Sequence, residues 1–342
     1  MAYQVEVIET GIVFEVNPKE KLLEAASRQG VRIYSDCEFG GCGTCRIKVV
    51  EGQVHYEDDF LPMSVSDEEH AEGFAAACQA QVNSDLKISL ANHIDILPET
   101  RALSLRVSSV RELCPGVREL RLQGENLTSA RYLPGQYLNI QLEDGRARSF
   151  SMATATAQNN ELRLFIREVE QGLFTQHQLP QLAVGQPLEV ELPLGNFYYR
   201  ARDWRPLIFV ATGTGIAPIR AILESLLDDE DCPPISLYWG MRSEQDLYQF
   251  DEFTAWAKRL SDFSFIPVLS QPEPSWQGRV GYVQDAVCAD HPDGSEFAFY
   301  LCGAPAMIAD AQTKFKAIGA DSDFIYADAF TFQHEQAVVE SV

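Results

Sequence analysis

The sequence predicts a multidomain protein that combines a small α+β domain, an antiparallel β-barrel and a parallel α/β domain. The first observation is length, because 342 residues are too many for one ordinary core. The second is a run of short alternating strands, separated by Gly, Asn and Pro, from about residue 103 to 200. The third is a change of pattern near residue 204, after which apolar strands alternate with helices.

Composition narrows the class of protein. About 46% of the residues are apolar and 23% are charged, as in soluble globular proteins. The opening MAYQVEVIET lacks the basic start and apolar run of a signal peptide, and no stretch has the length of a transmembrane helix, so we expect a cytoplasmic protein. The formal net charge of −23 argues against nucleic acid or an anionic membrane as partner. It is consistent with a solubilising surface or with a basic protein partner.

The small N-terminal domain contains a group of cysteines in the stretch YSDCEFGGCGTCRIKVVEG. The spacing is C-x4-C-x2-C, and a fourth cysteine follows after 32 intervening residues, so the candidate ligands are Cys37, Cys42, Cys45 and Cys78. Tetrahedral zinc and a [2Fe-2S] cluster both use four cysteines, but structural zinc usually takes paired C-x2-C knuckles. Three ligands in one loop and a lone fourth are the plant-type ferredoxin arrangement. The loop glycines would let the backbone curl around an anionic cluster, so we expect [2Fe-2S], with zinc as the alternative.

The segments around these cysteines support the same interpretation. YQVEVIE and IVFEV alternate like two hairpin strands, PKEKLLEAASRQGV is a short amphipathic helix, and CRIKVVEGQV and LKISL have the pattern of strands. This stretch resembles the plant-type ferredoxin, a β-grasp fold, and we assign residues 1–97 to it. Cys114, Cys232 and Cys288 lie elsewhere and are predicted to be small core residues.

The rest of the chain divides into two further domains and a tail. NHIDILPETRALS is predicted to be a linker. The strands LSLRVSSV, VRELRLQG, QYLNIQLE, RARSFSMAT, LRLFIREV and PLEVELPLG predict an antiparallel barrel over residues 103–202. PLIFVATG, PISLYWG, FSFIPVLS, FAFYLCG and DFIYADAF, with helices between them, predict a parallel α/β domain over residues 203–332. Residues 333–342 show no pattern and are expected to be flexible.

A glycine-rich turn, VATGTGIAPIR, lies where the first parallel strand passes into a helix. Gly213 and Gly215 allow a tight turn, and Pro218 suits the first helical turn, where its missing N–H is not needed. The free N–H groups at that helix end attract pyrophosphate. The motif is not G-x-G-x-x-G, and no Walker lysine follows, so the turn alone is weak evidence for a dinucleotide site.

Residues 103–332 resemble the ferredoxin–NADP reductase superfamily. The resemblance rests on five motifs in the expected order, RSFS (148–151), GLFT (172–175), PLGNF (193–197), GTGIAP (213–218) and CGAPAM (302–307). It implies that Arg148 binds the flavin pyrophosphate, which suits an arginine fork, and that Phe150 and Ser151 line the isoalloxazine. Phe150 replaces the usual tyrosine, so stacking is kept while a phenolic hydrogen bond to the ribityl chain is lost. Gly172 and Thr175 would hold the flavin phosphates.

The same resemblance implies where the nicotinamide lies. Cys302 would lie beside it, at the end of a parallel strand where such sheets place their ligands, and would orient hydride transfer together with Ser151. Phe330 would cover the flavin face. The further cofactor contacts that the resemblance implies are Ser149, Ile166, Phe174, Thr214, Gly215, Arg242, Gly303, Pro305 and Met307.

The choice of cofactors follows partly from residues and partly from the resemblance. After the second parallel strand, Arg242 could bind the 2′-phosphate of NADPH, whereas Glu244 and Asp246 favour the free ribose hydroxyl of NADH. We expect NADH. The GLFT and PLGNF turns resemble those of FAD-binding members, so we expect FAD, with FMN as the alternative.

Taken whole, the chain resembles the reductase components of multicomponent bacterial oxygenases, such as those that hydroxylate benzoate or phenol. The resemblance implies a monomer that passes electrons from NADH through FAD to a [2Fe-2S] cluster and on to an oxygenase component. A nicotinamide delivers two electrons at once and a metal centre accepts one at a time, which explains why three cofactors are needed. A reductase for deoxysugar biosynthesis and a non-catalytic flavin and cluster redox sensor are the alternatives.

Overall fold

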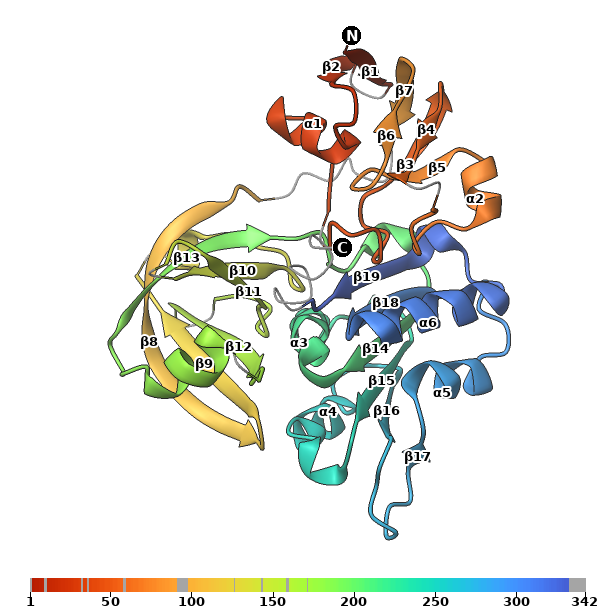
Figure 1. The fold of residues 1–342 in the computed structure, drawn as a ribbon. Helices are drawn as coiled ribbons and strands as arrows, with labels where there is room; N and C mark the ends of the chain where they lie inside the picture. The colour runs from red at the N-terminus through yellow and green to blue at the C-terminus, as the bar shows by residue number, and fades with distance from the viewer. Residues whose placement is uncertain are drawn as a thin grey trace. The chain divides into compact units, whose positions relative to one another are not determined.

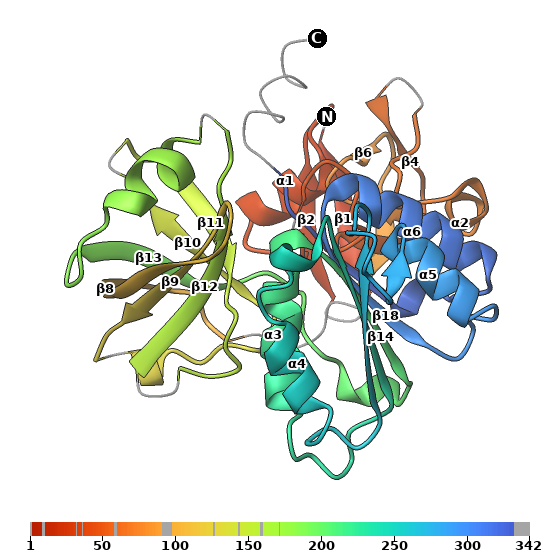
Figure 2. The same cartoon turned by 90° about the horizontal axis from the view of Figure 1, so that it is seen from below.

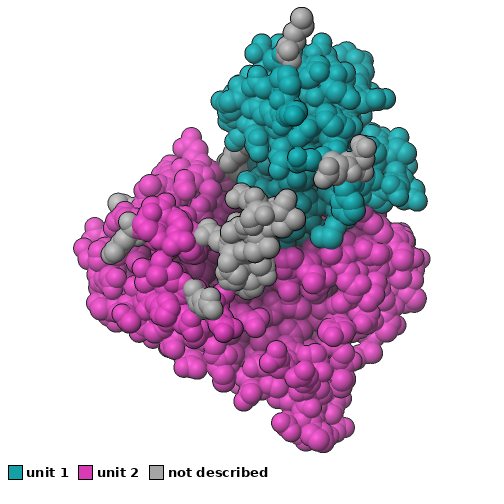
Figure 3. Space-filling view, in the orientation of Figure 1, with its two compact units in different colours: residues 1–96, 326–342 teal, residues 97–325 magenta. Residues whose placement is uncertain are grey.

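The computed structural model describes residues 2–8, 11–31, 33–35, 37–57, 60–90, 98–125, 127–142, 144–157, 160–170 and 172–331. The chain divides into two compact units (Figure 3). Unit 1 contains Met1–Ile96 and Tyr326–Val342, and unit 2 contains Leu97–Ile325. The predicted tail at 333–342 and residues 92–97 of the predicted linker lie outside the described residues.

The N-terminal unit is a small mixed sheet with one helix packed on it. Its elements are β1 (Tyr3–Val7), β2 (Ile12–Val16), α1 (Leu22–Arg28), β3 (Arg46–Glu51), β4 (Val54–His55), α2 (Asp67–Ala71), β5 (Phe74–Ala76), β6 (Gln81–Val82) and β7 (Leu86–Ser89). The strand order is β2-β1-β7-β3-β5, with β1 and β7 parallel and the other pairs antiparallel, while β4 and β6 form a separate ribbon. This arrangement confirms the predicted β-grasp fold.

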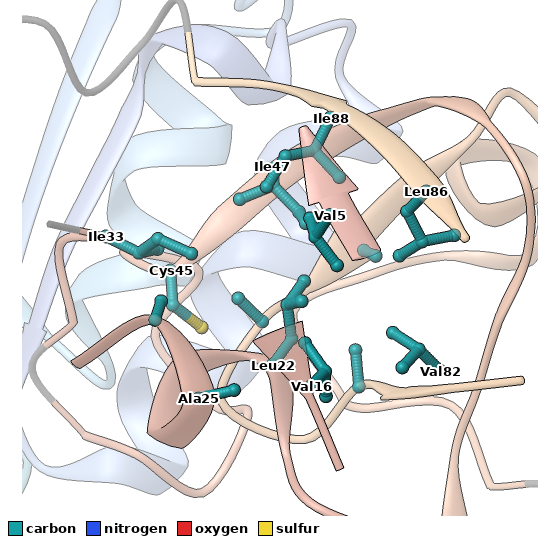
Figure 4. Packing of buried hydrophobic residues seen from close by; sticks show 14 of the residues in the cluster. Val5, Val16, Leu22, Ala25, Ile33, Cys45, Ile47, Val82, Leu86 and Ile88 are labelled. Atoms are coloured by element: carbon teal, nitrogen blue, oxygen red, sulfur yellow. The ribbon is translucent and has the colours of Figure 1, made fainter. Parts of the chain in front are cut away.

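The core of this unit explains why the helix forms where it does. Val5 and Val7 face inward from β1 because alternate residues of a strand share one face. Leu22, Ala25 and Ala26 of α1 are fully buried against them, at the spacing of one helical face. Figure 4 shows Val5, Leu22 and Ala25 packed together, with Cys45 among them. The cysteine loop is therefore attached directly to the hydrophobic core.

The first part of unit 2 is a closed antiparallel barrel. Its strands are β8 (Arg101–Cys114), β9 (Val117–Gln123), β10 (Tyr137–Gln141), β11 (Ala147–Ser151), β12 (Glu161–Arg167) and β13 (Pro187–Leu194), in the order β11-β10-β13-β8-β9-β12. A bridge between Met152 and Leu164 joins the two ends of this order. The interior is filled by buried leucines, isoleucines and valines, as expected from the alternating strand pattern.

The second part of unit 2 contains a parallel sheet with helices on both faces. The elements in unit 2 are β14 (Leu207–Thr212), α3 (Ile216–Ser225), β15 (Ile235–Met241), α4 (Phe250–Trp256), β16 (Phe263–Leu269), β17 (Arg279–Val280), α5 (Val283–Asp290), β18 (Ala298–Gly303) and α6 (Pro305–Ala317). The chain then forms β19 (Ile325–Ala329), of which only Ile325 belongs to unit 2. The strand order is β17-β16-β15-β14-β18-β19. Helices α3 and α4 cover one face, and α5 and α6 cover the other (Figures 1 and 2). Among the described residues, no helix has the length and apolar character needed to cross a bilayer.

Candidate functional site

The four predicted cluster ligands lie close together in the N-terminal unit. Cys37, Cys42 and Cys45 belong to the loop between α1 and β3, and Cys78 follows β5. Strand pairing explains the convergence, because β3 and β5 are antiparallel neighbours and the N–H of Ala77 donates to the carbonyl of Cys45 at 3.0 Å. All four cysteines are at most 4% exposed. The fold thus brings a distant fourth thiol to the loop that carries the other three.

The sulfurs form two pairs. The N–H of Cys42 donates to Sγ of Cys37 at 3.3 Å, and a hydrogen bond from the Cys42 thiol lowers the pKa of Cys37. In the second pair, the hydrogen bond to Cys78 raises the pKa of Cys45 well above its usual value, while the same bond lowers the pKa of Cys78. Backbone N–H groups in the loop also lower the pKa of Cys37 and Cys78. Such donors stabilise charged sulfurs.

The loop glycines let the backbone reach these sulfurs. Gly40 and Gly43 have φ values of +83° and +82°, which a residue with a side chain rarely adopts. A methyl group at Gly40 would also lie 2.7 Å from Cβ of Pro62, so the close approach requires glycine. Among the described residues, no three His, Cys, Asp or Glu side chains are arranged to hold a single metal ion. Two buried pairs of cysteine sulfurs with backbone donors fit a two-iron cluster.

The predicted flavin residues lie on β11 at one end of the barrel. Arg148 is partly buried and has no ion pair with a described carboxylate, and its Nη1 donates only to the neighbouring carbonyl of Ala147, at 2.8 Å. Burial lowers the pKa of Arg148, and the nearby charge of Arg146 lowers it further. A half-buried cation without a described counter-ion fits an anionic ligand such as a diphosphate.

Next to Arg148, the aromatic residues of two motifs meet. The rings of Phe150 and Phe174 are 5.5 Å apart, and both pack on the barrel core. Phe174 belongs to a π-helical segment, Leu173–Gln178, which begins directly after Gly172. The hydroxyl of Thr175 accepts from the N–H of Val169 at 3.1 Å, which closes the turn before this segment. The fold therefore brings the RSFS and GLFT motifs to one end of the barrel.

Other predicted flavin contacts differ in exposure. Ser151 is buried, whereas Ser149 is exposed and donates to Asn139 at 2.7 Å. Ile166 is 1% exposed within the barrel core, and its predicted contact with the flavin stays a prediction. Phe330 belongs to unit 1, and its predicted place over the flavin stays a prediction.

A cleft of about 1170 Å³ opens at the carboxyl ends of the parallel strands in unit 2. Its lining includes Thr212 and Thr214 from the end of β14 and the turn after it, Arg242 after β15, and Met307 on α6. This edge of a parallel sheet is where such folds bind nucleotides. Cys302 is fully buried beneath it and is not part of the lining.

Two glycines, Gly215 and Gly303, are neighbours in sequence of residues that line this cleft, and both are closely packed. A methyl group at Gly215 would overlap the carbonyl of Cys302, although the φ of Gly215 is ordinary. Gly303 has a φ of +137°, and a methyl group there would overlap Thr212. Thr212 also accepts a hydrogen bond from the N–H of Ala304 at 3.1 Å. The GTG turn and the CGAPAM motif are therefore packed backbone against backbone.

Comparison with known proteins agrees with this geometry. Three family models match, a 2Fe-2S iron-sulfur cluster binding domain at residues 5–83, an oxidoreductase FAD-binding domain at 104–199 and an oxidoreductase NAD-binding domain at 209–313. The reductase component of phenol 2-monooxygenase from Pseudomonas sp. (strain CF600) is 36% identical, covering 92% of this chain and 90% of its own. A CDP-6-deoxy-L-threo-D-glycero-4-hexulose-3-dehydrase reductase from Yersinia pestis is 30% identical, covering 96% of this chain and 99% of its own. The chain belongs to the iron-sulfur flavoprotein reductases.

A solved structure supports the same assignment. The Amycolatopsis cytochrome P450 reductase GcoB is 30% identical and covers 96% of this chain and 99% of its own, with a TM-score of 0.72. The reductase described here is an NADH-dependent oxidoreductase that holds a [2Fe-2S] cluster and FAD. The expectation of [2Fe-2S] in place of zinc, and of FAD and NADH as cofactors, is confirmed.

The structure of the reductase also reveals charged residues that the motifs did not indicate. Lys314 on α6 lines the cleft and forms ion pairs with Asp285 at 2.6 Å and Asp310 at 2.8 Å. The pair of Asp310 and Lys314 has the i, i+4 spacing of a helix and could have been predicted from it. On the barrel side, the cleft is lined by Arg167 and Glu168 at the end of β12. The sequence carried no sign that this segment would face the nucleotide edge.

Proposed function

We propose that this reductase delivers single electrons to the oxygenase component of a multicomponent oxygenase. The observation that carries the proposal is the presence in one chain of a nucleotide cleft and four buried, paired cysteines. FAD, when bound, accepts two electrons as hydride and gives them up one at a time. The cysteine loop is the exit, because the cluster ligands lie in a separate unit from the nucleotide site.

We further propose roles for the individual residues. Arg148 holds the flavin pyrophosphate, Phe150 packs on the ring system, and Ser151 contacts its reactive edge. The support is the half-buried charge of Arg148, which forms no ion pair with a described carboxylate, and the meeting of the two motifs at the barrel end. Thr214 and Arg242 contact the nucleotide in the cleft.

We also propose a role for Cys302 beneath the nicotinamide. Cys302 is buried under the turn, and its carbonyl lies against Gly215, so it shapes the floor on which the nicotinamide rests. The role follows from packing and requires no covalent chemistry at sulfur.

The relatives leave two kinds of acceptor to consider. Phenol 2-monooxygenase and anthranilate 1,2-dioxygenase have reductase or electron transfer components that are 36% and 31% identical to this chain. A deoxysugar dehydrase reductase is a second candidate, favoured by its 96% coverage of the chain at 30% identity. We propose the oxygenase acceptor, a monomeric reductase and a cytoplasmic location, where the cluster thiols stay reduced before assembly.

The test uses the purified holoprotein and a Cys42→Ser variant. The variant should lose the cluster iron and sulfide while keeping FAD, because the two cofactors bind in different units. It should keep NADH-dependent reduction of ferricyanide, which accepts electrons from flavin directly. Transfer to an oxygenase component, measured as NADH-coupled substrate hydroxylation, should be lost. Full coupled turnover by the cluster-free variant would show that electrons leave from flavin instead.

A Cys288→Ser variant is the matched control, since Cys288 lies on α5 outside the cluster loop. It should retain iron, FAD and coupled turnover. Separate assays with an oxygenase component and with a sugar-nucleotide dehydrase would distinguish the two acceptors. Efficient transfer to the dehydrase alone would overturn the oxygenase assignment and leave the electron route in place.

A further inference from the structure

A buried arginine on α3 contacts the barrel from the nucleotide-binding half of unit 2. Arg220 is 2% exposed, and its Nη1 donates to the carbonyl of Ala153. Its Nε and Nη2 donate to Glu252 at 2.9 and 2.6 Å, and Nη2 also donates to Glu224 at 3.1 Å. A planar guanidinium can hold a carbonyl and two carboxylates at once, which a lysine cannot.

The same helix holds the barrel segment at a second point. Oε2 of Glu224 accepts from the N–H of Ala155 at 2.7 Å. Arg220 and Glu224 are one turn apart on α3, so together they bind one carbonyl and one amide of a three-residue segment. Both contacts are to backbone, and this segment begins two residues after Ser151.

A network of charged residues holds the Arg220 guanidinium through its partner Glu252. Glu252 lies 3.8 Å from Nη1 of Arg163 on β12, and Nε of Arg163 donates to Glu119 at 2.6 Å. Trp256 stacks near the guanidinium at 5.1 Å. Arg220 and Glu119 are buried, and Glu252 and Arg163 are partly buried. Such a satisfied network is rigid, since each member would lose its partners by moving.

Helix α3 carries the nucleotide turn as well as Arg220. The GTG turn passes directly into α3, and Arg220 follows Gly215 by five residues, about 7.5 Å along the helix axis. Gly215 is itself packed on the carbonyl of Cys302. One rigid element therefore connects the nucleotide turn to the segment that follows Ser151.

We propose that Arg220 is a positioning residue for hydride transfer. Arg220 binds the carbonyl of Ala153, and Glu224 binds the N–H of Ala155. Together these two hydrogen bonds set the distance between Ser151 and the nucleotide turn. The proposal rests on the flavin role proposed above for Ser151. NADH loses a hydride with its two electrons and becomes NAD⁺, and bound FAD accepts that hydride. The nicotinamide and flavin rings must lie within a narrow range of distances, because a misplacement of about 1 Å lowers the rate about 100-fold.

The test compares FAD-loaded Arg220→Met, Arg220→Lys and Glu224→Ala with the wild type. Flavin reduction by NADH is followed in single-turnover stopped flow, per mole of bound FAD, and NAD⁺ affinity is measured by calorimetry. Arg220→Met should be about 100-fold slower, with NAD⁺ affinity within about threefold of wild type. Arg220→Lys keeps the charge but loses the planar fork. Glu224→Ala loses the hydrogen bond from Ala155 and one of the three acceptors of Arg220, and leaves the bond from Arg220 to Ala153 in place. Both should be about 10-fold slower, with a larger isotope effect from NADH deuterated at C4.

The control is Arg259→Met, in the same domain. Arg259 is 50% exposed, pairs only with Asp228 among the described ion pairs, and should leave the rate unchanged. A second readout uses the FAD-free protein, in which exchange of the Ala155 amide should be faster in Glu224→Ala than in wild type. Glu224 is 24% exposed, so this variant is expected to fold.

Three outcomes would overturn the proposal. The first is a wild-type rate of flavin reduction in Arg220→Met at full FAD content. The second is a loss of rate that only follows a loss of FAD, which would indicate a structural role. The third is unchanged exchange at Ala155 in Glu224→Ala. An error in the proposed flavin site would be detected separately. It would appear as unchanged FAD affinity in Arg148→Ala, independently of the results for the Arg220 variants.

Discussion

The cysteine loop at residues 37–45 and the nucleotide turn at 212–215 are both short, glycine-rich segments, yet they work through different parts of the chain. In the cysteine loop the function lies in side chains, and the glycines serve to aim backbone N–H groups at sulfur. In the nucleotide turn the function lies in the backbone, and Gly215 is required by a carbonyl that arrives from β18. Spacing alone therefore identified the first, whereas the second needed the whole domain as context.

The clearest contrast with the local cysteine loop is Glu119, whose partners come from separate parts of the barrel. Its carboxylate is 0% exposed and accepts hydrogen bonds from Arg111, Arg121 and Arg163. Glu119→Gln should lower the free energy of unfolding of unit 2 by about 3 kcal/mol, because a buried carboxylate that pairs with three partly exposed arginines is lost. Denaturant unfolding followed by flavin release measures this.

The stabilisation of unit 2 by Glu119 should depend on pH in a defined direction. Burial raises the pKa of Glu119, but the hydrogen bonds and charges of the arginines outweigh it and lower the pKa to about 2. The stabilisation is therefore present above the ordinary value of 4.5 and is lost as the pH falls from there towards about 2. The gap between wild type and Glu119→Gln should narrow below pH 4.5, while the cluster content at pH 7 is the same in both. A gap that does not change with pH would exclude this account.

The sequence predicted the fold well where patterns are local. The alternating barrel strands, the apolar parallel strands and the amphipathic α1 all lie where expected. Helix α2 was missed although Ser66 and Glu69 form a capping box, and α5 was missed because VQDAVCAD is short and only weakly amphipathic. Strand β17 has two exposed residues and carries no periodic signal.

Contacts between distant segments could not be predicted in the same way. Nothing in GTGIAPIR indicates that its arginine binds the carbonyl of Ala153, 67 residues earlier. Likewise Glu119 and Arg163 are ordinary charged residues in alternating strands until the barrel closes. Long-range polar partners depend on topology, which patterns of hydrophobicity specify only indirectly.

Gly215→Ala tests the claim that the nucleotide turn depends on a backbone contact. The added methyl group would overlap the carbonyl of Cys302, and neither backbone can rotate away. We expect a loss of about 3 kcal/mol in stability and at least about 10-fold weaker NAD⁺ binding, measured by thermal unfolding and calorimetry. In the control Gly145→Ala, φ is +80° but no atom lies within 4 Å, so the loss should be about 1 kcal/mol with NAD⁺ binding intact. Equal losses in both variants would mean that conformation, rather than close approach, requires Gly215.

Arg148→Ala tests a site that, like the cysteine loop, works through a side chain. Removing its charge-assisted contact should weaken FAD binding by about 2 kcal/mol, or about 30-fold, in a fluorescence titration of the FAD-free protein. The neighbouring Arg146 provides the control, because it is 56% exposed and already pairs with Asp144 at 2.6 Å. Arg146→Ala should bind FAD as the wild type does. If both variants bind FAD equally well, the pyrophosphate is held elsewhere.

The smallest expected effect concerns the charge around the cysteine loop, which the nucleotide turn does not share. The first 100 residues carry 18 Asp or Glu and 7 Lys or Arg, a formal net charge of −11. A basic surface on the electron acceptor would be attracted to this acidic unit. The rate of electron transfer to the acceptor should therefore fall several-fold as the ionic strength rises past about 0.1 M. The rate of ferricyanide reduction by NADH should not fall in parallel. Glu38, exposed beside Cys37, should contribute locally, and Glu38→Gln should weaken the salt dependence slightly. Glu51→Gln is the control, since Glu51 ends β3 about 20 Å along the strand from Cys45, beyond the Debye length. A rate that does not respond to salt would show that the acceptor recognises shape and apolar contacts at the loop, and that the acidic charge serves only solubility.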